Sequence, residues 1–186
     1  MSNIQASLSK TKKQMETVAI TDNIVFNEED NYIRIIDQTK LPGVLEYKNI
    51  TSLEDAYQAI RKLEVRGAPA IGIFAGYAMY MLARKDTDAS YPLFCEHFQK
   101  NREYLNSSRP TAVNLSWALG RMNDVVTSHR DLSVVQIIEK LKEEAYAIHE
   151  EDIQMCLSIC ENGLSLLKDG DGVLTHCNAG PLATSY

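Results

Sequence analysis

The chain has 186 residues, of which 45% are hydrophobic and 24% are charged, with a formal net charge of −6 and a pI near 5.2. Such a composition excludes intrinsic disorder as the default state, and the length exceeds the roughly 100–150 residues of a typical single domain. The acidic balance argues against nucleic-acid binding, because nucleic-acid-binding surfaces neutralise phosphates with lysine and arginine. A small anionic ligand needs only one or two well-placed cations and therefore remains compatible with this charge.

The amino-terminal segment and the cysteines indicate an intracellular protein. Residues 1–16 are polar and contain lysines, without the apolar core of a signal peptide, so we expect a loose N-terminal arm. The most apolar stretch, 68–83, contains two glycines and is shorter than the about 20 residues that span a bilayer. The four cysteines form no CxxC pair, which favours a reducing compartment. We expect a cytoplasmic protein that has no membrane partner.

Short extended segments follow the arm. Between residues 17 and 48 the segments TVAIT, NIVFN, YIRIIDQ and VLEYK are rich in β-branched and aromatic residues, and turn-like EEDN and LPG interrupt them. This pattern predicts a small antiparallel sheet.

The hydrophobic period then becomes helical. Thr51 with Glu54 has the spacing of a capping box and predicts a helix that runs to about Leu63. Pro69 suits the first turn of a second helix, whose apolar residues on all sides predict burial. Gly72 and Gly76 would let neighbouring elements approach it closely.

Three further helices are predicted. Phe94, Phe98 and Leu105 lie on one face of the first, and the second follows Pro110. Ser133 and Gln136 form a capping box at the start of a long third helix. Its apolar face is expected to comprise Ile137, Leu141, Ala145, Ile148, Cys156 and Ile159.

The final segment suggests the beginning of a different domain. LKDGDG is a turn signal, and GVLTHCNAG at 172–180 has the pattern of a buried strand that runs into a glycine-bearing loop. The fold class predicted is thus an α+β N-terminal domain, residues 17–168, leading into the first strand of a Rossmann-like α/β domain, residues 169–186, that is cut off. Because a lone strand cannot satisfy its backbone groups, we expect the sequence to be incomplete.

The first candidate for chemistry is Arg66-Gly67-Ala68-Pro69, at a predicted helix start. Backbone N–H groups and the helix dipole favour a phosphate there, the glycine permits close approach, and the arginine can bind an anion in a bidentate way. The alternative is a helix-initiating turn with a solvated arginine.

The second candidate is the turn at 106–111, Asn-Ser-Ser-Arg-Pro-Thr, in which Arg109 precedes a helix. It could reach a phosphate or sugar hydroxyls, or its polar side chains could only cap the helix.

The third candidate is Cys177, at the carboxyl end of the predicted strand, where open α/β sheets bind ligands. A buried thiol without a chemical role is the alternative. We expect Cys156 and Cys160 to pack in the core rather than bind a metal with His149, because two thiols fall short of a structural zinc site. Trp117 is likewise expected in the core.

Three segments in register, VRGAPAIGI at 65–73, NSSRPTAVNLSWAL at 106–119 and LTHCNAGPLAT at 174–184, resemble the methylthioribose-1-phosphate isomerase family. The resemblance begins near residue 15. The family is related to regulatory subunits of the guanine-nucleotide exchange factor of translation initiation, which share the fold without the isomerase site. RGAPA and SSRPTAVNL favour the enzyme branch.

The resemblance implies roles for individual residues. Arg66, Gly67 and Ala68 would hold the phosphate region, Arg109 would contact the substrate, and Cys177 would be the catalytic thiol. Asn178, Ala179 and Gly180 would shape the adjacent loop as further substrate-binding residues. The family's catalytic aspartate and the remaining lysine and asparagine of its pocket would lie beyond Tyr186, so the 186-residue chain alone is expected to be inactive.

The activity implied is conversion of 5-methylthioribose 1-phosphate to 5-methylthioribulose 1-phosphate in methionine salvage, without a cofactor or metal, by a homodimer when full length. A cysteine and an aspartate would move a proton, or a hydride would pass between C1 and C2 in a shielded pocket. Two alternatives remain open: isomerisation of 5-deoxyribose 1-phosphate or ribose 1,5-bisphosphate, and a regulatory relative that binds a sugar phosphate or nucleotide without catalysis.

Overall fold

The computed structural model describes residues 23–176 and 180–185, and its sheet has three antiparallel strands. These are β1 (Ile24–Asn27), β2 (Tyr32–Ile36) and β3 (Tyr47–Ile50), in the order β1-β2-β3. Ile24 pairs with Ile35, and Ile33 with Ile50, so the alternating isoleucines share one buried face. The predicted sheet is confirmed, although β3 begins three residues later than expected and TVAIT lies outside the described residues.

The first helix after the sheet, α2 (Leu53–Arg61), begins differently from the prediction. Its N-cap is Ser52 rather than Thr51, and the Ser52 hydroxyl accepts a hydrogen bond from the Asp55 N–H. The helix also stops earlier, because Leu63 adopts a left-handed φ of 64° and lies on the surface. The capping pattern therefore predicted the helix correctly but placed its N-cap one residue too early.

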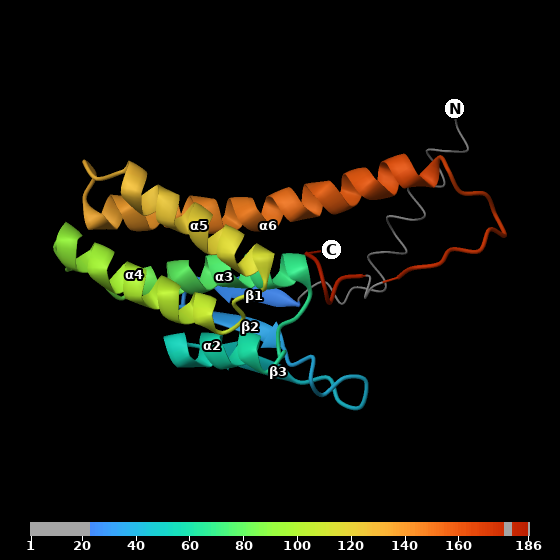
Figure 1. The fold of residues 1–186 in the computed structure, drawn as a ribbon, viewed down its shortest axis with the longest axis horizontal. Helices are drawn as coiled ribbons and strands as arrows, with labels where there is room; N and C mark the ends of the chain where they lie inside the picture. Colours follow the sequence, from blue (N-terminus) through green and yellow to red (C-terminus); the bar gives the residue numbers. More distant parts are fainter. Residues whose placement is uncertain (1–22, 177–179, 186) are drawn as a thin grey trace.

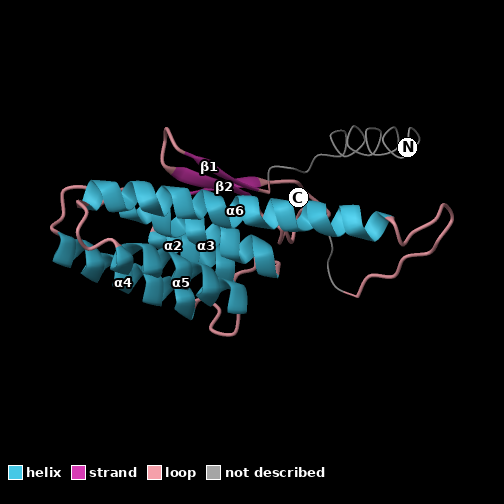
Figure 2. Cartoon of the chain, turned by 90° about the horizontal axis from the view of Figure 1, so that it is seen from above, coloured by secondary structure: helices cyan, strands magenta, loops and turns pink. Residues whose placement is uncertain are grey.

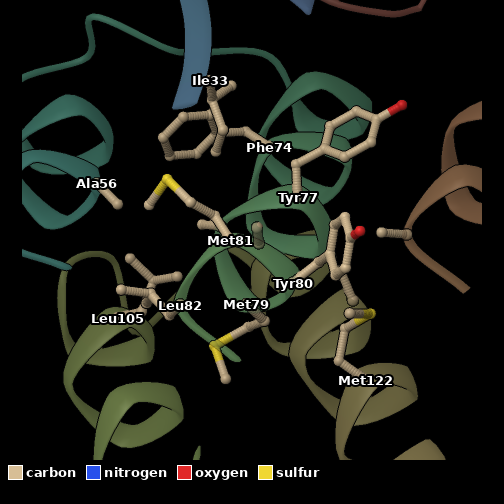
Figure 3. Close-up of a cluster of buried hydrophobic side chains, with 14 of the residues drawn as sticks. Ile33, Ala56, Phe74, Tyr77, Met79, Tyr80, Met81, Leu82, Leu105 and Met122 are labelled. Atoms are coloured by element: carbon tan, nitrogen blue, oxygen red, sulfur yellow. The ribbon is translucent and has the colours of Figure 1, made fainter. Parts of the chain in front are cut away.

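Helix α3 (Ala68–Ala83) lies at the centre of the fold, and every residue from Ala70 to Ala83 is buried. It contacts β1 and β2 on one side and α2, α4, α5 and α6 on the others. Figure 3 shows its Phe74 near Ile33 of the sheet and its Tyr80 near Met122 of α5. The predicted burial is confirmed. Within the described parts of the chain, no helix is both long enough and apolar enough to span a bilayer.

The remaining helices are α4 (Tyr91–Ser107), α5 (Val113–Ser128) and α6 (Val134–Leu164), and each forms where the sequence predicted a helix. Figure 2 shows the strands lying along one side of the helical layer. The Ser133–Gln136 capping box at the start of α6 is present in both directions, as predicted. The N–H of Gln136 donates to Ser133 Oγ, and the N–H of Ser133 donates to Gln136 Oε1.

Only the first half of α6 belongs to the core. Its buried residues end at Ile148, whereas Cys156 is half-buried and Ile159 is 66% exposed, which corrects the predicted apolar face. The reason is length: 31 residues span about 46 Å, whereas the 16 residues of α5 span about 24 Å. The second half of α6 thus extends past the helices that cover the first half (Figure 1).

The segment after α6 returns to the start of α3 without forming the predicted strand in its described part. Residues 172–176 have no strand pairing, and Val173 and Leu174 are 74% and 97% exposed. A strand is stable only beside another strand, and the described sheet lies elsewhere. The turn predicted at LKDGDG is present, since the N–H of Lys168 donates to Asp171 Oδ2. Residues 180–185 then lie close to α3 (Figure 1).

A partly buried tyrosine–histidine contact joins α3 to α6. The Tyr77 hydroxyl lies 2.8 Å from Nδ1 of His149 and shares a hydrogen bond with it. Burial lowers the pKa of His149 below its ordinary value, and the nearby carboxylates of Asp152 and Glu150 oppose this effect. The folded environment therefore disfavours protonation of His149.

This contact predicts a loss of stability in mild acid. The unfolded chain takes up a proton at His149 near pH 6.5, whereas the folded chain resists it, so the unfolded state binds more protons as pH falls below that value. The free energy of unfolding, measured in urea between pH 7.5 and 5.5, should therefore decrease with falling pH. Replacement His149→Gln should flatten this dependence.

The control is Tyr77→Phe, which removes the hydrogen bond and leaves the half-buried position of the histidine unchanged. It should lower stability at every pH and keep the slope, because desolvation is the main cause of the pKa shift. An equal slope in the parent chain and in His149→Gln would show that the imidazole does not cause the pH dependence.

Candidate functional site

Two of the three sequence motifs meet in one pocket of about 400 Å³. The pocket lies where two helices begin: Gly67 and Ala68 belong to the start of α3, and Ala112 to the start of α5. Its lining consists of Gly67, Ala68, Ile71, Arg109, Thr111, Ala112, Val113 and Asn114. The structure thus brings Gly67, Ala68 and Arg109 to one pocket, and their roles in substrate binding stay predictions.

The two helix starts favour an anion in this pocket. The N-caps are Gly67 and Ala112, and neither makes a side-chain capping hydrogen bond. Helix N-termini carry partial positive charge and direct N–H groups outward, so two of them at one pocket attract a phosphate more strongly than one.

The two predicted arginines have different positions. Arg109 lines the pocket, and its guanidinium has no hydrogen bond or ion pair with the described residues, which leaves its donors available to a ligand. Arg66 is exposed and does not line the pocket, although it directly precedes Gly67. The structure therefore places Arg109 at the pocket and Arg66 outside its lining, and the substrate contacts of both stay predictions.

Gly67 has a neighbour that the sequence did not reveal. A Cβ atom at Gly67 would lie 2.4 Å from the Cα of Ala183, and Gly67 has a φ of 100°. The sequence explained this glycine by the close approach of a ligand, whereas the structure shows that the chain itself approaches there. Only glycine satisfies both the left-handed backbone and the contact.

The third motif is described only in part. Gly180 lies at the surface, with a φ of 99°, and begins the described residues 180–185 that lie close to α3. Cys177, Asn178 and Ala179 lie outside the described residues, so their predicted roles remain predictions. The docked residues 181–185 nevertheless bring the end of this motif to Gly67.

The hydroxyls of the 106–111 turn do not cap α5. The alternative prediction, in which the polar side chains of this turn only cap the helix, is therefore wrong. Ser107 and Ser108 donate instead to the carbonyls of Tyr104 and Leu105 in the last turn of α4. Asn106 accepts a hydrogen bond from Ser116 of α5 through Oδ1. The turn therefore closes α4 and links it to α5, and Arg109 and Thr111 remain at the pocket.

A second pocket, of about 330 Å³, adjoins the first and shares Val113 and Asn114 with it. Most of its side chains are apolar, but Glu151 and Asp152 add two carboxylates. Trp117, predicted in the core, is 47% exposed and lines this pocket. The full lining is Pro69, Ile73, Val113, Asn114, Trp117, Ile148, Glu151, Asp152 and Met155.

The cysteines of α6 do not form a metal site with the described residues. No cluster of three or more potential metal ligands occurs within 23–176 and 180–185. His149 is engaged with Tyr77, and Cys160 is exposed rather than in the core as expected. Burial is the main reason why the pKa of the Cys156 thiol lies above its ordinary value, which disfavours the thiolate that a metal would need.

The sequence analysis did not identify several residues at or near the site. Thr111 and Asn114 lie within a recognised motif, and their position beside Arg109 was the signal that could have identified them. Asn23 and Gln38, which bind residues 181 and 182, flank strands β1 and β2 and carried no such signal.

Comparisons with known proteins agree with this architecture. Residues 64–185 match the Initiation factor 2 subunit family. The chain is 51% identical over 160 residues to a methylthioribose-1-phosphate isomerase of Parabacteroides distasonis, a match that covers 86% of this chain and 48% of that protein. It is 46% identical over 162 residues to a 5-deoxyribose 1-phosphate isomerase of Clostridium botulinum, covering 87% and 46%. The chain spans about half the length of these curated relatives.

Solved structures share the fold. The crystal structure of 5-methylthioribose 1-phosphate isomerase from Pyrococcus horikoshii OT3 matches with a TM-score of 0.83 and 35% identity, over 88% of this chain and 45% of that chain. The translation initiation factor eIF-2B, subunit delta, from A. fulgidus matches with a TM-score of 0.76 and 39% identity, over 87% and 46%. The small sheet and its helices are therefore common to isomerases and initiation-factor subunits, as the resemblance implied.

The contact at Gly67 predicts a large effect of a single methyl group. Gly67→Ala should lower the free energy of unfolding by roughly 1–3 kcal/mol, because alanine is strained at positive φ and its Cβ would collide with Ala183. Urea unfolding of the two chains measures the difference.

The matched control is Gly120→Ala. Gly120 lies within α5, and a Cβ there would meet no atom within 4 Å, so this change should leave stability unchanged or raise it by about 0.5–1 kcal/mol. Equal effects of the two substitutions would contradict the proposed constraint at Gly67.

Proposed function

The chain belongs to the Initiation factor 2 subunit family, and we propose that within it the chain is the amino-terminal part of an aldose–ketose isomerase that acts on a pentose 1-phosphate. The relatives named as isomerases of methylthioribose 1-phosphate and of 5-deoxyribose 1-phosphate support this assignment. A homologous initiation-factor subunit has the same fold, so the choice between an isomerase and an initiation-factor subunit depends on the site.

The observation that carries the proposal is the pocket between the starts of α3 and α5. It combines two helix N-termini without side-chain caps and the unengaged guanidinium of Arg109, which together suit the phosphate of a sugar phosphate. Thr111 and Asn114 add polar groups that can bind sugar hydroxyls. A volume of about 400 Å³ accommodates a pentose phosphate.

The proton-transfer chemistry requires groups beyond this lining. Among the described residues the pocket is lined by no carboxylate, imidazole or thiol, whereas acid–base isomerisation needs one group that accepts a proton and one that donates or polarises. Cys177, which precedes Gly180 by three residues in the sequence, is the proposed thiol. We propose that an aspartate outside these 186 residues is its partner, so the chain alone does not turn over.

The function is tested by assaying conversion of an aldose 1-phosphate to the ketose 1-phosphate. The extended protein, meaning these residues with their natural continuation or with the remaining part of the P. distasonis relative, should be active, and the 186-residue chain should be inactive. Cys177→Ser in the extended protein should lower kcat by about 10²–10⁴-fold, the usual contribution of a general acid or base.

The matched control is Cys95→Ser, which changes a half-buried thiol on α4 outside the pocket and should leave kcat unchanged. Full activity of Cys177→Ser would refute the thiol assignment and favour a binding role without catalysis. Turnover by the 186-residue chain alone would refute the need for the additional group.

We further propose that the C5 substituent of the sugar is apolar and occupies the adjoining pocket. Trp117, Met155 and neighbouring aliphatic side chains line it, and burying a methyl or methylene group there gains about 0.8 kcal/mol. A thioether also interacts favourably with an aromatic ring such as that of Trp117. The carboxylate of Asp152 would repel a second phosphate, whereas that of Glu151 is paired with the Arg121 guanidinium.

This arrangement predicts a substrate order for the extended protein: kcat/KM should be highest for 5-methylthioribose 1-phosphate, lower for 5-deoxyribose 1-phosphate, and lowest for ribose 1,5-bisphosphate. Met155→Ala should lower kcat/KM for the methylthio substrate by about tenfold, within the range for lost apolar contacts, and affect the deoxy substrate less. Ile159→Ala is the control, because Ile159 lies one turn further along α6, is similarly exposed and does not line the pocket. A preference for the bisphosphate would contradict the assignment of this pocket.

A further inference from the structure

Residues 180–185, called here the return segment, are bound to the start of α3 and to α6. The N–H of Ala70 donates to the Ala183 carbonyl at 3.1 Å, and Ala183 is 5% exposed. At the other end, the N–H and the hydroxyl of Ser185 donate to Asp152 Oδ2 at 2.8 and 2.6 Å. The return segment therefore forms a defined edge beside Gly67 and the pocket.

Two side-chain amides from the sheet region hold the middle of the return segment. Nδ2 of Asn23 donates to the carbonyls of Pro181 and Leu182 at 3.2 and 3.1 Å, and Nε2 of Gln38 donates to the Leu182 carbonyl at 2.7 Å. Asn23 is 4% exposed and Gln38 is 5% exposed, so both side-chain amides are buried and these carbonyls take the place of water as their acceptors.

The chemistry of this contact requires donors. Proline has no N–H, so the Pro181 backbone can only accept, and a buried carbonyl without a donor is costly. Within the described residues Asn23 Oδ1 and Gln38 Oε1 have no hydrogen-bond partner, so the amide groups serve here through their nitrogens. An uncharged apolar residue would avoid burying those oxygens but would leave the carbonyls unpaired.

We propose that Asn23 and Gln38 are positioning residues of the isomerase: by holding the Pro181 and Leu182 carbonyls they fix the return segment beside Gly67, at the edge of the pocket that Gly67 and Arg109 line. The inference rests on the proposed function. A purely structural role would affect stability alone, whereas a positioning role also lowers the rate of the chemical step while leaving substrate binding nearly intact.

The docking is tested on the 186-residue chain by hydrogen exchange. Asn23→Asp and Gln38→Glu keep the shape of each side chain but replace the donating nitrogen with an oxygen that repels the carbonyls. Amide exchange in residues 182–185 should become faster by about tenfold in each variant, as expected for the loss of a buried hydrogen bond.

The matched control is Asn31→Asp. Asn31 also donates from Nδ2 to a backbone carbonyl, that of Met81, but it makes no contact with the return segment. In the Asn31→Asp variant, the amide hydrogens of residues 182–185 should exchange at the same rate as in the parent chain. Unchanged exchange in Asn23→Asp and Gln38→Glu would overturn the proposal at its first step.

The catalytic part is tested in the extended protein. Asn23→Asp and Gln38→Glu should lower kcat by about 10–100-fold and change KM by less than about threefold, since misplacement affects the reaction more than ground-state binding. Asn31→Asp should keep the parent kcat. Faster exchange with an unchanged kcat would overturn only the positioning role, whereas absence of turnover in the unsubstituted extended protein would overturn the proposed function and this role together.

Discussion

The burial of α3 from Ala70 to Ala83 is the constraint on which the rest of the fold depends. A helix that is apolar on all sides must be covered on all sides, and the sheet, α2, α4, α5 and α6 provide that cover. Its glycines set how closely two of these elements approach: a Cβ at Gly72 would lie 3.3 Å from the Asn114 carbonyl, and one at Gly76 would lie 3.2 Å from Ile148. Because Gly72 is near the start of α3 and Asn114 near the start of α5, this packing places two helix N-termini side by side and so creates the pocket.

Much of this arrangement could be predicted from the sequence because it depends on local patterns. Hydrophobic periodicity located β1, β2 and the five described helices, and the Ser133–Gln136 capping box defined the start of α6. The pocket could also be anticipated, since Gly67 and Arg109 each precede a helix and the resemblance connected them. Each of these features is specified by residues that lie close together in the sequence, and sequence patterns can identify such features.

Features that depend on distant contacts could not be predicted in this way. Periodicity continues along α6 beyond Ile148, but whether a helical face is buried depends on which other elements lie beside it, and α5 is only half as long. Trp117 was expected in the core for the same reason and instead lines a pocket. The bonds from Asn23 to residues 181 and 182 join positions more than 150 apart in sequence, and no local signal specifies them.

The return segment also changes how the pocket can bind an anion. Of the N–H groups in the first turn of α3, that of Ala70 is bound to Ala183, that of Ile71 is bound to Gly67, and Pro69 has none. Ala68 thus keeps the one first-turn N–H without an acceptor among the described residues. A phosphate in this pocket must therefore draw most of its hydrogen bonds from Arg109 and the start of α5, while α3 contributes its dipole and the space at Gly67. The return segment thus occupies an N–H group, that of Ala70, which the RGAPA motif alone would offer to an anion.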